Sequence, residues 1–164
     1  KFDPEKAKWF NQQYLRKKTD GELADAFRPI LKAKGYERDE AFMLEFCKLV
    51  KEKVQFVHEF WDHGKYIFEA PVSYDEKVMT KKWNDKSKDQ FKLVQHKFTT
   101  IEEWKTQNIH DGFEDLSKEI GKIDMQLLRV LITGVAGGPQ LFDMLALMGK
   151  DEVLNRLSAA LDKF

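Results

Sequence analysis

The sequence has a single cysteine among its 164 residues, and this scarcity excludes an intrachain disulfide. Cys47 stands beside apolar neighbours such as Phe46 and Leu49, a setting typical of a small buried hydrophobe in a reducing compartment. We therefore expect a cytoplasmic protein. The four histidines show no paired ligand spacing with each other or with Cys47, so we predict no metal site.

Long apolar runs are also missing. No run approaches the roughly 20 residues that a membrane-spanning helix needs, and the first residues lack the pattern of a secretory signal. Because the first residue is Lys1 rather than Met, we expect the sequence to be cut from a longer protein.

An excess of positive charge is absent as well. The chain has 28 basic and 28 acidic residues, so its formal net charge is zero. Non-specific affinity for nucleic acid comes mostly from many cations that displace counterions. We therefore expect no membrane and no DNA partner, and only weak RNA binding by this chain alone. Recognition of a few bases remains compatible with neutrality, because base contacts specify while phosphate contacts position.

Motifs of a self-contained enzyme are missing too. The sequence has no glycine-rich phosphate loop, no Ser–His or Cys–His pattern, and no spacing that singles out an acid and a base. We predict that this chain has no catalytic residues.

What the sequence does contain is helical periodicity almost throughout, which predicts an all-α fold. Capping patterns predict helix starts at Asp3-Pro4-Glu5, Thr19-x-x-Glu22, Ser73-x-x-Glu76 and Thr100-x-x-Glu103. Further helices are expected over 42–57, 111–120, 123–133, 139–148 and 150–161, with a kink or break at Pro29. We place a boundary at Ala70-Pro71, which gives two helical-bundle subdomains, 1–70 and 71–164.

The most informative stretch is the helix expected over 123–133. It places Gln126 and Arg129 one turn apart on a shared edge. Gly134 can end this helix in the left-handed conformation, and Pro139 can begin the next. A guanidinium and an amide on one edge could together read one base.

Arg129 could instead have a purely structural role. Its side chain could lie over the helical core and pair with Asp124 or Asp143. The sequence alone leaves both readings of Arg129 open.

The motifs occur in an order that resembles a known family. They are Phe2-Asp3-x-Glu5-Lys6-x-x-Trp9-x-Asn11-x-x-Tyr14, Arg129-x-x-x-Thr133-Gly134, Gly138-Pro139-x-Leu141-Phe142, Gly149-Lys150 and Arg156-Leu157. This order resembles the C-terminal anticodon-binding region of bacterial glutamyl-tRNA synthetases, which are class I aminoacyl-tRNA synthetases.

The resemblance implies that a parent glutamate–tRNA ligase activates glutamate with ATP and Mg²⁺ and attaches it to tRNA(Glu). The catalytic domain that binds ATP would lie outside this sequence, and the chain itself would need no cofactor. A monomer is expected. The residues implied to contact the anticodon are Arg129, Gln126, Gly138, Pro139, Leu141 and Phe142, and those implied to contact the tRNA body are Asn11 and Trp9.

Several alternatives stay open. Trp9 also fits a core position, because a large ring at helical spacing usually packs. The helix expected to read the first anticodon base has no arginine over 42–54, which leaves that reading and the rejection of tRNA(Gln) open. A groove around Leu141 and Phe142 could instead accept a partner helix, which would make the chain a protein-interaction module.

Two further groups of side chains could serve RNA or simply structure. Trp61, Tyr66 and Phe68 could stack on bases or fill a buried hinge between the subdomains. The lysines at 81, 82, 86 and 88 could guide phosphates, although interleaved acids favour a solvated face.

Overall fold

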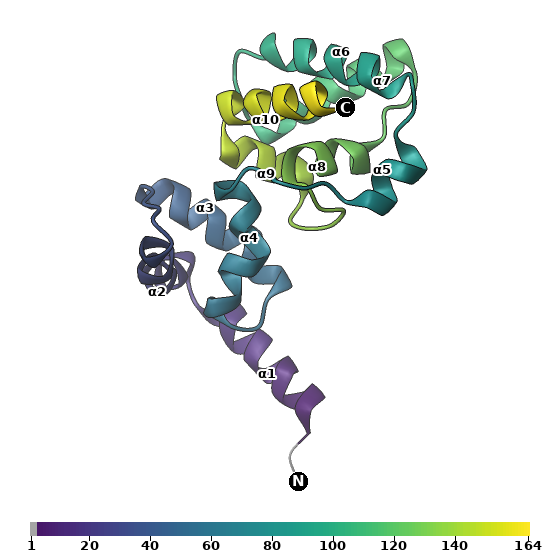
Figure 1. Ribbon diagram of the computed structural model, residues 1–164. Helices are drawn as coiled ribbons and strands as arrows, with labels where there is room; N and C mark the ends of the chain where they lie inside the picture. Colours follow the sequence, from purple (N-terminus) through teal and green to yellow (C-terminus); the bar gives the residue numbers. More distant parts are fainter. Residues whose placement is uncertain (1–2) are drawn as a thin grey trace. The chain divides into compact units, whose positions relative to one another are not determined.

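The computed structural model describes residues 3–164, except for the side chains of residues 10–12. Within this part of the chain it contains ten α-helices, two short 3₁₀ helices and no strand (Figure 1). The predicted all-α class is confirmed. The chain divides into unit 1, Lys1–Phe68, and unit 2, Glu69–Phe164, two residues before the boundary expected from the sequence.

Unit 1 contains α1 (Pro4–Lys17), α2 (Asp20–Ala33), α3 (Glu40–Val50), η1 (Lys51–Lys53), η2 (Val57–Glu59) and α4 (Phe60–Phe68). The first two helices begin at the predicted caps. Asp3 Oδ1 accepts a hydrogen bond from the N–H of Glu5 at 3.0 Å, and Thr19 Oγ1 accepts one from Glu22 at 3.1 Å. The chain runs through Pro29 as one helix, α2, rather than two.

The helix predicted over 42–57 is wrong in length. The α-helix ends at Val50, and η1 follows before the backbone becomes extended at Val54. Val54 is fully buried, so it continues the apolar spacing from an extended segment. For Val54 the apolar periodicity therefore predicted the burial correctly and the helical conformation incorrectly.

Phenylalanine rings form the core of unit 1. The rings of Phe27 and Phe46 stack with centroids 5.1 Å apart, and Phe60 meets Phe27 edge-on at 5.7 Å. Helix α4 comes close to these rings because Gly64 presents no side chain to Phe46. Gly64 thus lies inside α4, against the core.

Cys47 is expected to be inert in the folded protein. Its side chain is fully buried, and burial raises the pKa of the thiol to about 12. The nucleophilic thiolate is therefore scarce at neutral and mildly alkaline pH. We expect no reaction with an aromatic disulfide reagent in the native state and one equivalent of thiol after denaturation. Rapid labelling of the native chain would contradict this burial.

Unit 2 contains α5 (Glu76–Lys82), α6 (Ser87–Thr99), α7 (Thr106–Ile120), α8 (Met125–Thr133), α9 (Leu141–Met148) and α10 (Lys150–Lys163). Three predicted starts are wrong. Asp75 rather than Ser73 caps α5, α7 begins at Thr106 and runs to Ile120 as a single helix, and α9 begins after Gln140 rather than at Pro139. The predicted end at Gly134 is confirmed by its φ of 83°.

In unit 2, α10 packs against α6, α8 and α9 (Figure 1). Side chains from α10 reach backbone groups on neighbouring segments. Arg156, 3% exposed, donates to the carbonyl of Ile132 at 3.2 Å and to Glu152 at 2.8 Å. Lys150 Nζ donates to the carbonyl oxygens of Thr99 and Ile101, each at 2.8 Å. These bonds hold the end of α8 and the end of α6 against α10.

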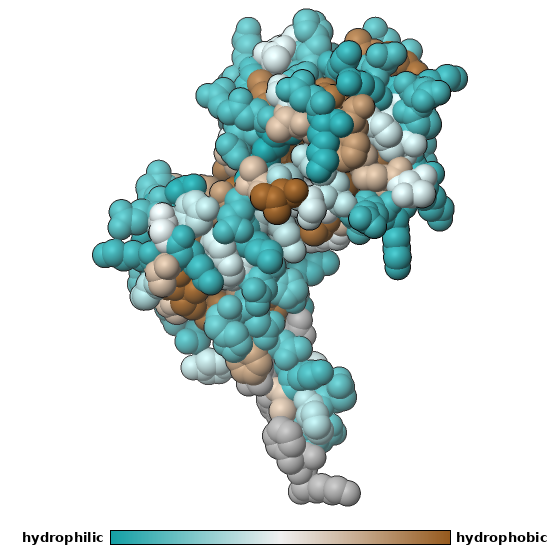
Figure 2. All heavy atoms as spheres, in the orientation of Figure 1, coloured by the Kyte–Doolittle hydropathy of each residue, from teal (hydrophilic) through white to brown (hydrophobic). Residues whose placement is uncertain are grey.

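The visible surface is mainly hydrophilic, and apolar residues form separate patches on it (Figure 2). Among residues 3–164, no helix combines the length and apolar character needed to cross a membrane.

Candidate functional site

The candidate site is the corner of unit 2 formed by α8, the loop 134–140 and the start of α9. Asp124 starts α8 by accepting a hydrogen bond from the N–H of Leu127 at 3.0 Å. Lys82 lies 3.0 Å from the other oxygen of the same carboxylate. Burial alone would raise the pKa of Asp124, but the bonds from Lys82 and Leu127 hold it below its usual value. The cap is therefore ionised at neutral pH.

The end of α8 is fixed by Thr133 and Gly134. The buried Thr133 hydroxyl donates to the carbonyl of Arg129 at 2.8 Å and accepts from the N–H of Val135 at 3.2 Å. Gly134 takes the left-handed conformation, and its carbonyl accepts from the N–H of Asp75 at 2.9 Å. This role of Thr133 was not predicted from the sequence, although its place before a helix-ending glycine was a usable signal.

Arg129 connects α8 to the loop. Its Nη1 donates to the carbonyl oxygen of Pro139 at 2.7 Å, and a Cβ added to Gly138 would lie 3.2 Å from that Nη1. Gly138 has a φ of 144°, which favours glycine. The loop therefore lies close over the guanidinium. The buried Pro139 supplies the carbonyl oxygen that accepts the hydrogen bond from Arg129.

The Arg129 head is half-buried and still reaches solvent. Burial lowers the pKa of Arg129, yet a guanidinium stays protonated at neutral pH. Among the described residues no buried side-chain nitrogen lacks a hydrogen bond, so the donors that Arg129 does not use for Pro139 are accessible to water. No described carboxylate lies within ion-pair distance of Arg129, so the alternative pairing with Asp124 or Asp143 is wrong.

The solvent side of the corner combines polar groups with bare backbone. Gln126 is half-buried one turn before Arg129, and Gly137, Gly138 and Gln140 are exposed. Nothing lies within 4 Å of a Cβ placed on Gly137. A planar ligand with hydrogen-bond acceptors can thus approach the loop and meet a positioned donor fork. Within residues 3–164, no group of His, Cys, Asp and Glu side chains is placed to hold a metal ion.

Leu141 and Phe142 are buried at the start of α9. Their side chains are 3% and 1% exposed, and the Phe142 ring packs against Phe113 at 5.7 Å and His110 at 5.1 Å. These side chains therefore offer little surface to a base, and the contact implied for them by the resemblance stays a prediction. They support the start of α9, which in turn carries the loop.

Of the two residues implied to contact the tRNA body, only Trp9 has a described side chain. Trp9 lies on α1 and is 56% exposed, so the core alternative for Trp9 is wrong. The side chain of Asn11 lies outside the described residues. Of the candidate lysines, Lys82 is committed to Asp124, whereas Lys81 and Lys86 are exposed.

A family model described as "Anticodon binding domain" matches residues 22–161. The chain is 41% identical to a glutamate–tRNA ligase of Flavobacterium psychrophilum over 165 residues, which cover 98% of the chain and 32% of that protein. A ligase of the same name from Flavobacterium johnsoniae is 39% identical over the same shares.

Solved structures agree with the sequence matches. A crystal structure of a glutamate tRNA ligase from Elizabethkingia meningosepticum superposes with a TM-score of 0.93 and 29% identity, and covers 98% of this chain and 32% of that one. The corresponding protein of Elizabethkingia anophelis gives a TM-score of 0.89 at 29% identity. The chain therefore spans about a third of the length of these relatives, and the match falls in their C-terminal part.

Proposed function

Since the chain belongs to the anticodon-binding domain family, we propose that it is the part of a glutamate–tRNA ligase that selects tRNA(Glu) by its anticodon. The parent enzyme would activate glutamate with ATP and Mg²⁺ in a separate catalytic domain. No residue of this chain is assigned to that chemistry. It would contribute contacts that form only with the cognate tRNA and that lower the free energy of that complex.

The observation that carries the proposal is the anchored guanidinium of Arg129. The bond of 2.7 Å to the Pro139 carbonyl fixes one nitrogen, and the remaining donors reach solvent. A donor fork held in one orientation loses little entropy when it meets the edge of a base. Unpaired anticodon nucleotides present such edges, because they can be splayed out of the stack.

The corner also gives a base room to approach. Gly137 and Gly138 are exposed and carry no side chain, so the ring of a nucleotide can come close to the backbone there. Gln126 can donate to and accept from the same base, because its amide offers both groups. Contacts of this kind would favour the complex in which the distant acceptor end of the tRNA reaches the catalytic site.

The rival function, a protein-interaction module, loses its main support in this structure. It required an apolar groove at Leu141 and Phe142, and both side chains are buried in unit 2. A nuclease footprint of the full-length protein on tRNA(Glu) separates the two functions. Protection of the anticodon loop supports selection of tRNA, and an unprotected anticodon loop rejects it.

The Arg129→Ala variant of the full-length ligase tests the assignment directly. We expect kcat/KM for tRNA(Glu) to fall about tenfold, the scale of one base contact of about 1.4 kcal/mol. The KM values for ATP and glutamate should not change. Lys118→Ala, which removes an exposed charge on α7 of the same unit, should leave all three values unchanged.

Because Arg129 also anchors the loop, the anticodon must be varied too. A base substitution in the anticodon should lower kcat/KM of the wild-type enzyme. The same substitution should lower the already reduced kcat/KM of Arg129→Ala only slightly. Equal losses in both enzymes would mean that Arg129 acts only on the loop and does not read a base.

A further inference from the structure

An aromatic and cationic cluster lies in unit 1. Tyr36 follows α2, and its ring stacks on that of Trp61 from α4 with centroids 5.9 Å apart. Both rings also contact Phe68, Tyr36 at 5.5 Å and Trp61 at 5.9 Å. Phe68 is buried, whereas Tyr36 and Trp61 are half-buried and therefore present ring surface to solvent.

Two exposed cations cover this cluster. The Arg38 guanidinium carbon lies 5.7 Å from the centre of the Tyr36 ring and 5.3 Å from that of Phe68. Lys34 Nζ lies 5.4 Å from the centre of the Trp61 ring. These are the distances of cation–π pairs, and the cations occupy positions over ring faces that an aromatic base could also take.

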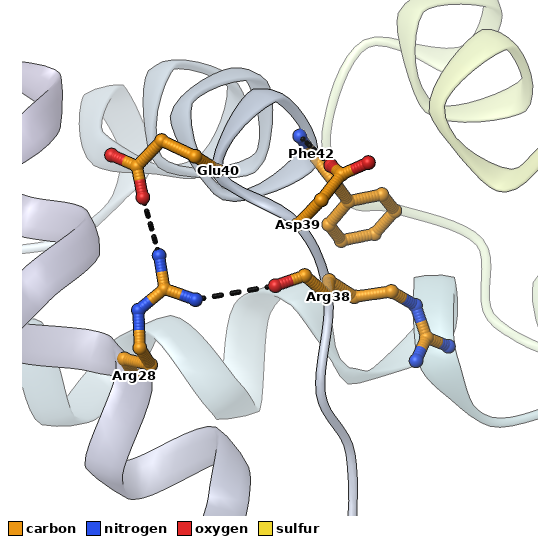
Figure 3. Close-up of polar contacts among 5 residues, drawn as sticks. All are labelled: Arg28, Arg38, Asp39, Glu40 and Phe42. Carbon is orange, nitrogen blue, oxygen red and sulfur yellow. Dashed lines mark hydrogen bonds and ion pairs between the residues drawn. The ribbon is translucent and has the colours of Figure 1, made fainter.

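The backbone beneath Arg38 is fixed by other residues (Figure 3). Arg28 from α2 donates to the carbonyl oxygen of Arg38 at 3.2 Å and pairs with the carboxylate of Glu40. Asp39 caps α3 by accepting from the N–H of Phe42 at 2.8 Å. The Arg38 side chain points away from Arg28 and Glu40, as Figure 3 shows, and its guanidinium carbon lies 5.5 Å from the centre of the Phe42 ring.

Arg38 is also free of a neutralising partner. Two neighbouring carboxylates, Asp39 and Glu40, are engaged elsewhere, and Arg38 Nη1 donates only to the carbonyl of Glu37 at 2.8 Å. No described carboxylate lies within ion-pair distance of its guanidinium. An exposed cation over aromatic rings without a carboxylate suits an anionic, planar ligand.

We infer that this cluster binds an unpaired nucleotide of the tRNA, additional to any that the Arg129 corner takes. The inference rests on the proposed function, since tRNA is then the ligand. The base would stack on Trp61 and Tyr36 after Lys34 swings aside, and Arg38 and Lys34 would meet its phosphates. Stacking on aromatic side chains with nearby cations is how proteins hold single-stranded nucleotides without reading their sequence.

The test measures binding of a tRNA(Glu) transcript to the full-length ligase at low salt. We expect Tyr36→Leu to weaken binding about tenfold, while Tyr36→Phe, which keeps the ring, binds like the wild type. Arg38→Gln should weaken binding about fivefold. Lys118→Gln, which removes one charge from an exposed position of α7, is the matched control and should have little effect. Thermal melting by circular dichroism checks that each variant is folded.

A photoreactive uridine transcript gives an independent readout. Cross-links to peptides that contain Tyr36 or Trp61 are expected with the wild type and should disappear in Tyr36→Leu. If the folded variants bind tRNA like the wild type, the cluster is structural and the inference fails while the proposed function stands. If the wild-type full-length ligase binds no tRNA(Glu) at all, the inference and the proposed function fail together.

Discussion

Gly134→Ala is expected to lower the free energy of unfolding by about 2 to 5 kcal/mol. A left-handed backbone costs an L-residue about 1 to 2 kcal/mol, and forcing a methyl into a filled space costs about 1 to 3 more. At φ 83°, a Cβ on Gly134 would lie 2.9 Å from the Cβ of Pro71 and still closer to the carbonyl oxygen of Ser73. Moving a backbone oxygen out of the way costs more free energy than moving the end of a flexible side chain. The segment before α5 must therefore move, and the bond from the N–H of Asp75 to the Gly134 carbonyl is strained with it.

The neighbouring loop supplies a matched control. Gly137 is exposed, has an ordinary φ, and a Cβ there would meet nothing within 4 Å. Gly137→Ala should therefore change the free energy of unfolding by less than about 0.5 kcal/mol. Urea titration followed by circular dichroism measures both variants. Equal stabilities for the two variants would contradict the role given to Gly134.

Helix boundaries were predictable where the capping chemistry is local. Asp3, Thr19 and Gly134 end or start helices through atoms within a few residues of themselves, so their sequence context suffices. The pattern Thr100-x-x-Glu103 has the same spacing and fails. Its hydroxyl donates backwards to the carbonyl of Lys97 at 2.6 Å and so closes α6 instead of opening α7. One side chain can serve either end of a helix, and the spacing does not say which.

Burial at the candidate site was less predictable than helix position. Helix α9 has the sequence LFDMLALM, in which a single acid interrupts the apolar residues. No polar face therefore marks which of its side chains face solvent. Leu141 and Phe142 are buried because α9 packs on α7, a contact that local periodicity does not report. Trp9 shows the reverse case, since helical spacing favoured a core position and its ring is exposed.

The cluster in unit 1 illustrates the same limit. Tyr36 and Arg38 follow α2, whereas Trp61 and Phe68 belong to α4. The sequence marked Trp61 and Phe68 as possible stacking residues but gave no reason to join them to Tyr36. Their ring contacts arise only because the segment after α2 lies against α4.

Gly64→Ala is expected to destabilise unit 1 by about 2 kcal/mol. Two effects compete. Alanine gains about 1 kcal/mol over glycine inside a helix, but overpacking a filled core costs about 1 to 3 kcal/mol and occasionally more. A Cβ on Gly64 would lie closer than 3.0 Å to two atoms of the Phe46 ring and 3.2 Å from Val50 Cγ1. The ring cannot shift freely, because Phe27 and Phe68 pack against it at 5.1 and 5.2 Å. The overlap should therefore outweigh the gain in helix propensity.

A double-mutant cycle separates this overlap from a general intolerance of α4. Phe46→Leu alone should destabilise the chain, because it removes a fully buried ring and leaves a cavity. In that background the Gly64→Ala methyl enters vacated space, so the second substitution should cost nothing or stabilise. Chemical denaturation of the two single variants and the double variant measures the coupling, expected at about 2 kcal/mol in favour of the double variant. Additive losses would mean that Gly64 is required for a reason other than its contact with Phe46, and the packing of α4 on α3 would then need a different explanation.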